Sequence, residues 1–342
     1  MSQGQPRAAA IFRTAAPSLL LVVVVLISLV IGKYNVSMRD IVTVIGAKLT
    51  GVPSGLPATA EAVVWNVRLP RVACALFVGA SLAAAGTVYQ GLFRNPLVSP
   101  DILGVSAGAS LGAVLGIFLS LPVLAIQGLA FAGGLGAVGL VYMIGAAVRG
   151  HDPILVLVLA GVAIGALLGA CISLLKVLAD PYNQLPAITF WLLGSLASVT
   201  RGDFLSVLPA MIVGLIPMVL LRWRVNLMTL DDQEARALGI ETTRMRIILI
   251  AAATLMTAAA VSISGIIGWI GLLVPHVARL LVGPNFSKLL PASLLLGGGY
   301  LVAVDMLARS MAQIEVPLGI LTAAIGAPFF IWLLMTTRRG WQ

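Results

Sequence analysis

The sequence predicts an all-α, polytopic membrane protein with about ten transmembrane helices. Of its 342 residues, 60% are hydrophobic and only 10% are charged, and the mean hydropathy is +1.09. A soluble domain of this length would need a larger charged surface, so the composition excludes an ordinary soluble protein. The 36 glycines and 18 prolines are typical of transmembrane helices that approach one another closely or are broken.

The apolar runs divide the chain into ten expected spans. About 20 apolar residues in a helix cross the hydrocarbon core of a bilayer. We expect one transmembrane permease domain over residues 1–342, because polar breaks separate the runs without any soluble insertion of domain size. The expected spans are residues 15–32, 71–92, 102–120, 128–148, 154–178, 205–221, 244–264, 267–282, 290–309 and 317–337.

Two longer polar segments lie between these spans on one side of the membrane. Residues 33–67 predict an outer loop, because they contain Pro53 and Pro57 and are too polar to insert fully. Residues 179–203 predict an outer loop followed by a short interfacial helix. Such a half-length piece either lines an opening or is a plain re-entrant connector.

The basic residues indicate the orientation. The net charge of +9 would suggest a nucleic-acid partner for a soluble protein, but here it reflects Lys and Arg in cytoplasmic loops. With both termini inside, 13 of the 21 basic residues fall on or near the inner face. The cluster at Arg222–Arg246 and the pair Arg338–Arg339 contribute most to this bias.

Three arginines are expected at the outer face: Arg68, Arg71 and Arg309. Arginine forms bidentate pairs with carboxylates, so this set could receive acidic residues of a docking protein. The alternative is contact with lipid headgroups or pairing within the chain. Asp305 lies one helical turn before Arg309 and could partly neutralise it.

The inner face offers a candidate gate and a candidate docking helix. Pro96 prevents a continuous helix where the second span ends, so Asn95 and Leu97 could narrow a pore mouth opposite the turn at residues 151–155. In residues 230–240, Asp231 could begin a short helix that Gly239 ends. This helix either inserts into a cytosolic partner or is a solvated connector.

Several sequence patterns are absent. The chain has no Gly-x-x-x-x-Gly-Lys-Ser/Thr nucleotide loop, so energy from ATP would have to come from another polypeptide. No His-Glu-x-x-His metalloprotease motif is present, and we expect no enzymatic activity. No carboxylate is expected near the middle of a span, which disfavours an ion-coupled secondary transporter, the main alternative function.

Six motifs occur in a fixed order from about residue 60 to the end. They are Arg68–Arg71, Gln90–Leu97, Pro100–Gly108, Glu234–Gly239, Gly265–His276 and Pro317–Pro328. Together they resemble the FecCD-type permeases, the membrane subunits of bacterial ABC importers for ferric siderophores, haem and cobalamin. The resemblance therefore favours docking and coupling roles for the polar segments over the alternatives above.

The resemblance implies a type II ABC importer permease in the bacterial inner membrane, with alternating access at a dimer interface. The implied partners are a second permease subunit, most simply in a homodimer, two cytosolic ATPase subunits, a periplasmic substrate-binding protein and membrane lipid. The chain itself would hold no cofactor and no metal, since the ATPase subunits would bind ATP–Mg. The Ala, Gly, Leu and Val of the pathway do not specify which chelate is carried.

The resemblance also assigns roles to residues. Arg68, Arg71 and Arg309 match the arginines that receive glutamates of the binding protein. Asn95 and Leu97 match a cytoplasmic gate, and a second gate falls near Ile154. The expected ATPase-coupling residues are Asp231, Asp232, Glu234, Ala235, Arg236, Leu238 and Gly239.

Overall fold

The computed structural model describes residues 7–148 and 153–336, which form fifteen α-helices, a π-helical stretch and a 3-10 turn, with no strand among them. The all-α, polytopic class is confirmed. The number of helices, however, exceeds the ten that were expected, because the polar segments contain short helices of their own.

The ten expected segments each coincide with an apolar helix. By length and composition, six of the described helical stretches are sufficient to cross a membrane, and four shorter apolar helices accompany them. The ten helices are α1 (Arg7–Val30), α4 (Leu69–Leu92), α5 (Val105–Phe118), α6 (Val123–Ala147), α7 (Pro153–Leu178), α9 (Arg201–Leu220), α12 (Thr242–Ser264), α13 (Ile270–Val282), α14 (Phe286–Ser310) and α15 (Leu318–Thr336).

Short helices occupy the segments between them. These are α2 (Met38–Thr50), α3 (Ala58–Ala62), η1 (Val63–Arg68), η2 (Pro100–Leu103), α8 (Gln184–Leu192), α10 (Arg222–Leu227) and α11 (Asp232–Ala237). Residues 33–67 are therefore largely helical rather than an open loop. Ser37 and Asp40 form a capping box at the start of α2, and Gly51 ends the helix in the left-handed conformation (φ 74°).

The second span is longer than expected because α3, η1 and α4 form one continuous helical stretch, Ala58–Leu92. The π-helical stretch η1 ends at Arg68. A π-helical turn inside an α-helix often marks a functional site. Here it brings Arg68 to the end of the bundle where the other outer arginines lie.

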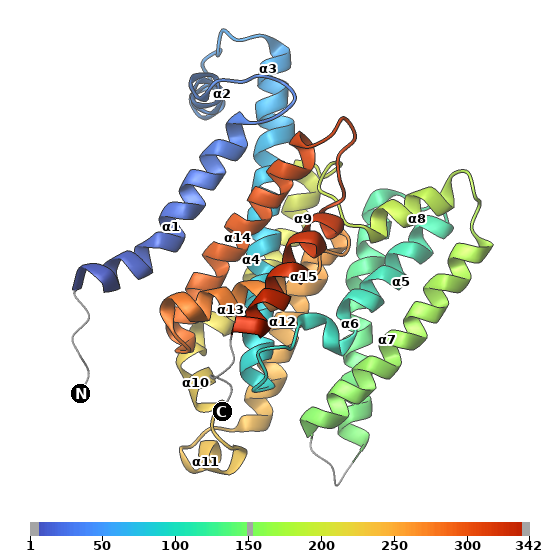
Figure 1. The fold of residues 1–342 in the computed structure, drawn as a ribbon. Coiled ribbons are helices and arrows are strands. Elements are labelled where there is room, and N and C mark those ends of the chain that lie inside the picture. The colour runs from blue at the N-terminus through green and yellow to red at the C-terminus, as the bar shows by residue number, and fades with distance from the viewer. Residues whose placement is uncertain (1–6, 149–152, 337–342) are drawn as a thin grey trace.

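The bundle has a buried centre and an open side. Figure 1 shows α4, α12 and α14 in the middle, with α1 on one side and α7 on the other. The apolar windows that include α4 and α12 are each 78% buried, whereas that of α7 is only 17% buried. Helices α2 and α3 lie at one end, and α10 and α11 lie at the opposite end (Figure 1).

Glycines permit the closest helix contacts. Gly108 and Gly112, one turn apart on α5, face α6. A Cβ on Gly112 would lie 2.0 Å from the Leu129 carbonyl oxygen, and one on Gly108 would lie 2.3 Å from that of Gly133. Small residues at this spacing let membrane helices pack backbone to backbone.

Candidate functional site

Three arginines gather at the end of the bundle that carries α2 and α3. Arg68 ends η1, Arg71 lies in the first turn of α4 and Arg309 lies in the last turn of α14. Each residue is only 4–6% exposed. The structure thus brings the three expected docking residues together but places them below the surface, and we call this set the arginine cluster.

Two members of the arginine cluster hold the end of α1. Arg68 Nη1 donates to the Leu29 carbonyl at 2.6 Å. Arg309 Nη2 donates to both the carbonyl and the hydroxyl of Ser28, each at 2.6 Å. The last carbonyls of a helix have no partner within that helix, so these guanidinium groups satisfy them. Gly32 makes room, since a Cβ there would lie 2.8 Å from Arg68 Nη2.

The third member, Arg71, is paired with two carboxylates. Its Nε donates to Asp305 Oδ1 at 2.9 Å, and its two Nη atoms donate to Glu315 at 3.0 and 2.8 Å. Asp305 Oδ2 also lies 3.4 Å from Arg309 Nε, the pair that the sequence indicated. Burial would raise the pKa of Glu315, but the hydrogen bonds and charge of Arg71 outweigh it and lower that pKa.

A surface hollow leads to the arginine cluster. It has a volume of about 660 Å³ and includes Arg309, Lys33 and Gln313 in its lining. Lys33 Nζ donates to the Gln313 carbonyl at 2.6 Å, which ties the end of α1 to the loop after α14. A carboxylate entering from outside would therefore meet positive charge at this point.

The candidate coupling helix is α11, at the opposite end of the bundle. Gly239 has φ 82° and ends it, with the Ile240 amide donating to the Ala235 carbonyl at 3.0 Å. Ala235 is buried, whereas Leu238 is 58% exposed. Glu234 and Arg236 are also exposed, and the side chain of Asp232 lies outside what the structure describes. One face of the helix thus packs against the bundle through Ala235, and the opposite face is exposed.

The candidate gate residues lie on two elements. Asn95 and Leu97 belong to the turn after α4, where the Asn95 side chain accepts a hydrogen bond from the Leu97 amide at 2.9 Å. Leu97 is 46% exposed. Ile154 lies in the first turn of α7 and packs against the large apolar cluster at this end of the bundle. His151 and Asp152 of the expected facing turn lie outside the described residues.

Arg94 joins the gate turn to the coupling segment. Its Nε donates to the Met228 carbonyl at 3.2 Å, and its Nη1 lies 3.6 Å from Asp231 Oδ1. In the sequence, Arg94 is one of the expected inner-face basic residues and part of the Gln90–Leu97 motif, with no indication of a contact to the coupling segment. No local pattern could have found this role, since Met228 is 134 residues away.

The described residues contain no group of three His, Cys, Asp or Glu side chains that could hold a metal ion. Cys74 is a buried free thiol, and Cys171 is a free thiol on α7. What the two ends offer is charge, hydrogen bonds and contacts between segments. These features suit binding of other proteins and transmission of movement.

Comparison with known proteins establishes the family. The model of the FecCD transport family matches residues 20–336. This chain belongs to the FecCD transport family. As a member of it, the chain is a multi-pass permease subunit of the ABC importer type, in which ATPase activity lies in a separate subunit.

Relatives of this FecCD family member transport different substrates. It is 39% identical over 323 residues to the molybdate import system permease protein MolB of Haemophilus influenzae, covering 94% of this chain and 95% of that protein. It is 40% identical over 360 residues to the cobalamin import system permease protein BtuC of Halobacterium salinarum, covering 96% of each.

The fold of this FecCD family member also matches a solved structure. That structure is an inward-facing conformation of an ABC transporter described as being of the metal-chelate type, with a TM-score of 0.85 and 38% identity. The match covers 94% of this chain and 98% of the other.

Proposed function

We propose that this chain is the permease of an ATP-driven importer for a metal chelate, such as a ferric siderophore, haem or cobalamin. Two copies form the pathway at their interface, two cytosolic ATPase subunits bind ATP–Mg, and a periplasmic binding protein delivers the substrate. Both termini and α11 face the cytoplasm of a bacterial cell, and the chain lies in the inner membrane. The chain itself carries no catalytic group and no cofactor.

The observation that carries this proposal is the contact of Arg94 with Met228 and Asp231. Because Arg94 precedes the gate turn directly, a displacement of α11 by the ATPase pulls on Asn95 and Leu97 through one side chain. Closure of the ATPase pair on ATP can move the permease only if the contacts of α11 differ between the two states. The exposed residues of α11, Glu234 and Arg236, and the exposed Leu238 and Gly239 that follow it form the surface that the ATPase would hold.

The outer end receives the binding protein. Acidic side chains of that protein enter the hollow beside Arg309 and Lys33 and interact with the arginine cluster. Glu315 and Asp305 hold Arg71 while no partner is present. On docking, carboxylates of the binding protein thus replace those of Asp305 and Glu315 as partners of the arginine cluster. This exchange favours a state in which the contacts among α1, α4 and α14 differ from those in the free permease.

The relatives support a family-wide mechanism with variable cargo. The names of two similar permeases refer to molybdate and to cobalamin, which share neither size nor charge. A pathway wall of apolar residues gives little discrimination between such substrates. We therefore assign the choice of chelate to the binding protein.

The decisive experiment reconstitutes the permease in liposomes with its ATPase and a loaded binding protein. Uptake of labelled chelate should require ATP and all three components. A permease without the ATPase should show no uptake, with or without a proton gradient. Uptake by the isolated chain driven by a proton gradient would make it a secondary transporter and contradict the proposal.

The role of Arg94 has its own test. Replacing it (Arg94→Ala) should leave assembly with the ATPase and ATP hydrolysis intact, while substrate moved per ATP hydrolysed falls about fivefold or more. Lys288→Ala is the matched control, because Lys288 lies in the first turn of α14 at the same end of the bundle but outside this contact. Unchanged coupling in Arg94→Ala would refute a direct link from α11 to the gate turn.

A further inference from the structure

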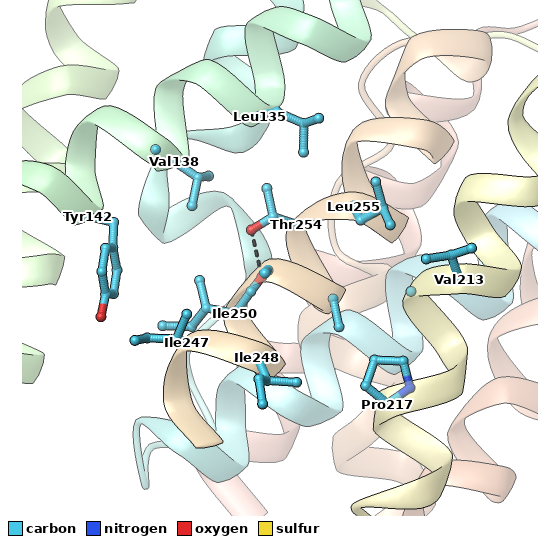
Figure 2. Close-up of a pocket in the computed structure, with 14 residues that line it drawn as sticks. Leu135, Val138, Tyr142, Val213, Pro217, Ile247, Ile248, Ile250, Thr254 and Leu255 are labelled. Carbon is cyan, nitrogen blue, oxygen red and sulfur yellow. Dashed lines mark hydrogen bonds between the residues drawn. The ribbon is translucent and has the colours of Figure 1, made fainter. Parts of the chain in front are cut away.

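An apolar groove runs between α6 and α9, with α12 as its floor. Its volume is about 640 Å³. Figure 2 shows side chains from three helices pointing into it, among them Val138 and Tyr142 of α6, Val213 and Pro217 of α9, and Thr254 of α12. The Thr254 hydroxyl donates to the Ile250 carbonyl within α12 at 2.7 Å, so it is satisfied without a ligand. The groove thus presents almost entirely hydrocarbon.

The groove is open because a glycine leaves space for it. Gly139 of α6 lines the groove, and a Cβ built on it would meet no atom within 4 Å. Gly214 of α9 lets that helix approach α12 closely, since a Cβ there would lie 2.5 Å from Met256 Cγ. Helix α9 packs closely on α12 at Gly214, and α6 has no side chain at Gly139. Together these two features produce a slot along α12. A flexible hydrocarbon chain lying in this slot would make dispersion contacts with its apolar walls.

The groove continues into a second, polar hollow towards the α11 end. Ile247 and Ile248 line both cavities. The second hollow has a volume of about 830 Å³, and its polar lining is Arg236, Glu241, Thr242, Thr243 and Arg244. An apolar slot at membrane depth therefore leads to a polar mouth at the end of the helix bundle.

The charge of this mouth is positive. Arg244 faces Glu241 at 3.9 Å, but both side chains are 77% exposed, so this pair is weak and Arg244 can turn to another anion. Arg236 Nε donates to the Thr242 hydroxyl at 3.3 Å, which leaves its Nη groups directed elsewhere. The mouth contains two arginines and one glutamate, so its net positive charge favours binding of an anion.

The neighbouring helix α10 has the character of a membrane interface. It begins immediately after α9 with Arg222, Trp223 and Arg224. Trp223 is 56% exposed, and the Arg224 guanidinium lies 5.6 Å from its ring centroid. Exposed tryptophan beside arginine is typical of residues at the level of lipid headgroups. Helix α10 lies at the same end of the bundle as α11 (Figure 1), so we place this end of the bundle at headgroup depth.

We propose that the groove and its mouth bind one anionic phospholipid, with an acyl chain along α12 and the phosphate between Arg236 and Arg244. Basic pockets between membrane helices on the cytoplasmic side are known to suit anionic headgroups. The lipid belongs to the leaflet on the α11 side, which is cytoplasmic if the proposed function is right. Because Arg236 is part of α11, the bound headgroup holds the coupling helix against α12, and the composition of the membrane then affects coupling.

The test measures lipid binding by native mass spectrometry of the purified permease. The probes are dioleoyl phosphatidylglycerol, dioleoyl phosphatidylcholine with the same chains, and glycerol phosphate without chains. The wild type should retain phosphatidylglycerol in preference to phosphatidylcholine and should not retain glycerol phosphate. Equal retention of glycerol phosphate would show a soluble-anion site and overturn the proposal.

Two variants separate the groove from its mouth. Gly139→Phe fills the slot and should reduce retention of both lipids, whereas Gly136→Phe should not. Gly136 lies on the same helix, also has no atom within 4 Å of a built Cβ, and does not line the groove. Arg244→Gln should reduce the preference for phosphatidylglycerol roughly fivefold, as expected for one charge at a membrane surface, while Lys288→Gln should leave it unchanged. Equal loss in both members of either pair would refute the site.

The full transporter gives the remaining comparison. If the ATPase subunit occupies the mouth instead, phosphatidylglycerol will be displaced when the complex assembles, which would overturn the proposal. Retention in the complex supports it. This measurement does not depend on uptake, so a failure of lipid binding leaves the importer assignment untouched, and a failure of ATP-driven uptake leaves the lipid site untouched.

Discussion

At the level of single residues, the arginine cluster shows how three buried guanidinium groups are kept charged. A buried charge is costly unless it is paired and hydrogen-bonded. Arg68 and Arg309 use the free carbonyls at the end of α1, and Arg71 uses Asp305 and Glu315. The same contacts hold α1, α4 and the loop after α14 together.

Only part of this cluster could be predicted from the sequence. Asp305 and Arg309 are one helical turn apart, so their pairing follows from helical spacing. Arg71 and Glu315 are 244 residues apart, and no local pattern connects them. The sequence predicted that the three arginines lie on one side of the membrane, but their partners depend on which helices are neighbours in the fold.

Removal of the Glu315 carboxylate should destabilise the permease. In Glu315→Gln the side-chain amide keeps one oxygen as an acceptor but carries no charge. Arg71 therefore keeps one of its two hydrogen bonds to this side chain and loses the other. We expect a loss of about 1–2 kcal/mol, in the range for a charge-assisted hydrogen bond that is partly exposed, seen as a lower Tm in detergent. The control Lys48→Gln breaks a pair that is 43% exposed on the lysine side and should change Tm little. Equal Tm values for wild type and Glu315→Gln would contradict the role given to this pair.

The same carboxylate makes stability dependent on pH. Because the folded-state pKa of Glu315 is lowered, its contribution is present above the ordinary glutamate pKa and is lost as pH falls through the folded value. The amide hydrogens of the loop at residues 311–317 should therefore lose protection, measured against the intrinsic exchange rate at each pH, below about pH 4. In Glu315→Gln the exchange of this loop should be fast already at neutral pH and lose that dependence. A wild-type loop whose protection is flat across this range would argue against the ion pair.

At the level of elements, hydropathy identified the long helices and capping patterns identified some of the short ones. The helix at residues 232–237 was found because Asp231 precedes it and Gly239 follows it. The helix α2 was missed although Ser37 and Asp40 form a capping box, because the prolines that follow suggested an open loop. Which helices pack together was beyond the sequence, since glycine spacing indicates a close contact but not the partner.

The contact between α5 and α6 gives a test at this scale. A valine at position 112 cannot be accommodated by rotation of a side chain, because the atom it meets is the Leu129 carbonyl of the facing backbone. Gly112→Val should therefore destabilise the permease by about 1–3 kcal/mol or more and reduce the folded fraction in size-exclusion chromatography. Gly136→Val has open space around its Cβ and should fold normally. A well-folded Gly112→Val would show that the two helices can separate at little cost.

For the whole molecule, the difference in burial between α4 and α7 identifies a helix face that the rest of the described chain leaves uncovered. The stretch with α4 is enclosed by neighbours, whereas α7 contacts the rest of the bundle with one face only. Gly161 lies on the face of α7 that contacts the bundle, since a Cβ there would lie 2.1 Å from the Ile102 carbonyl oxygen. One and two turns later, Gly165 and Gly169 have no atom within 4 Å of a built Cβ. Lipid would cover this face of α7 in a monomer, and a second copy would cover it in the proposed dimer.

A bulky residue on the free face of α7 distinguishes these two cases. Gly165 and Gly169 have the small-x-x-x-small spacing at which membrane helices cross closely, so a second α7 is the partner that this face fits. Gly165→Trp should convert the detergent-solubilised dimer into a monomer by light scattering while leaving its Tm near that of the wild type, because none of the described residues occupies the space. Gly136→Trp places the same side chain on α6 and should remain dimeric. If Gly165→Trp also remains dimeric, α7 faces lipid or the open pathway, and the two copies must meet through other helices.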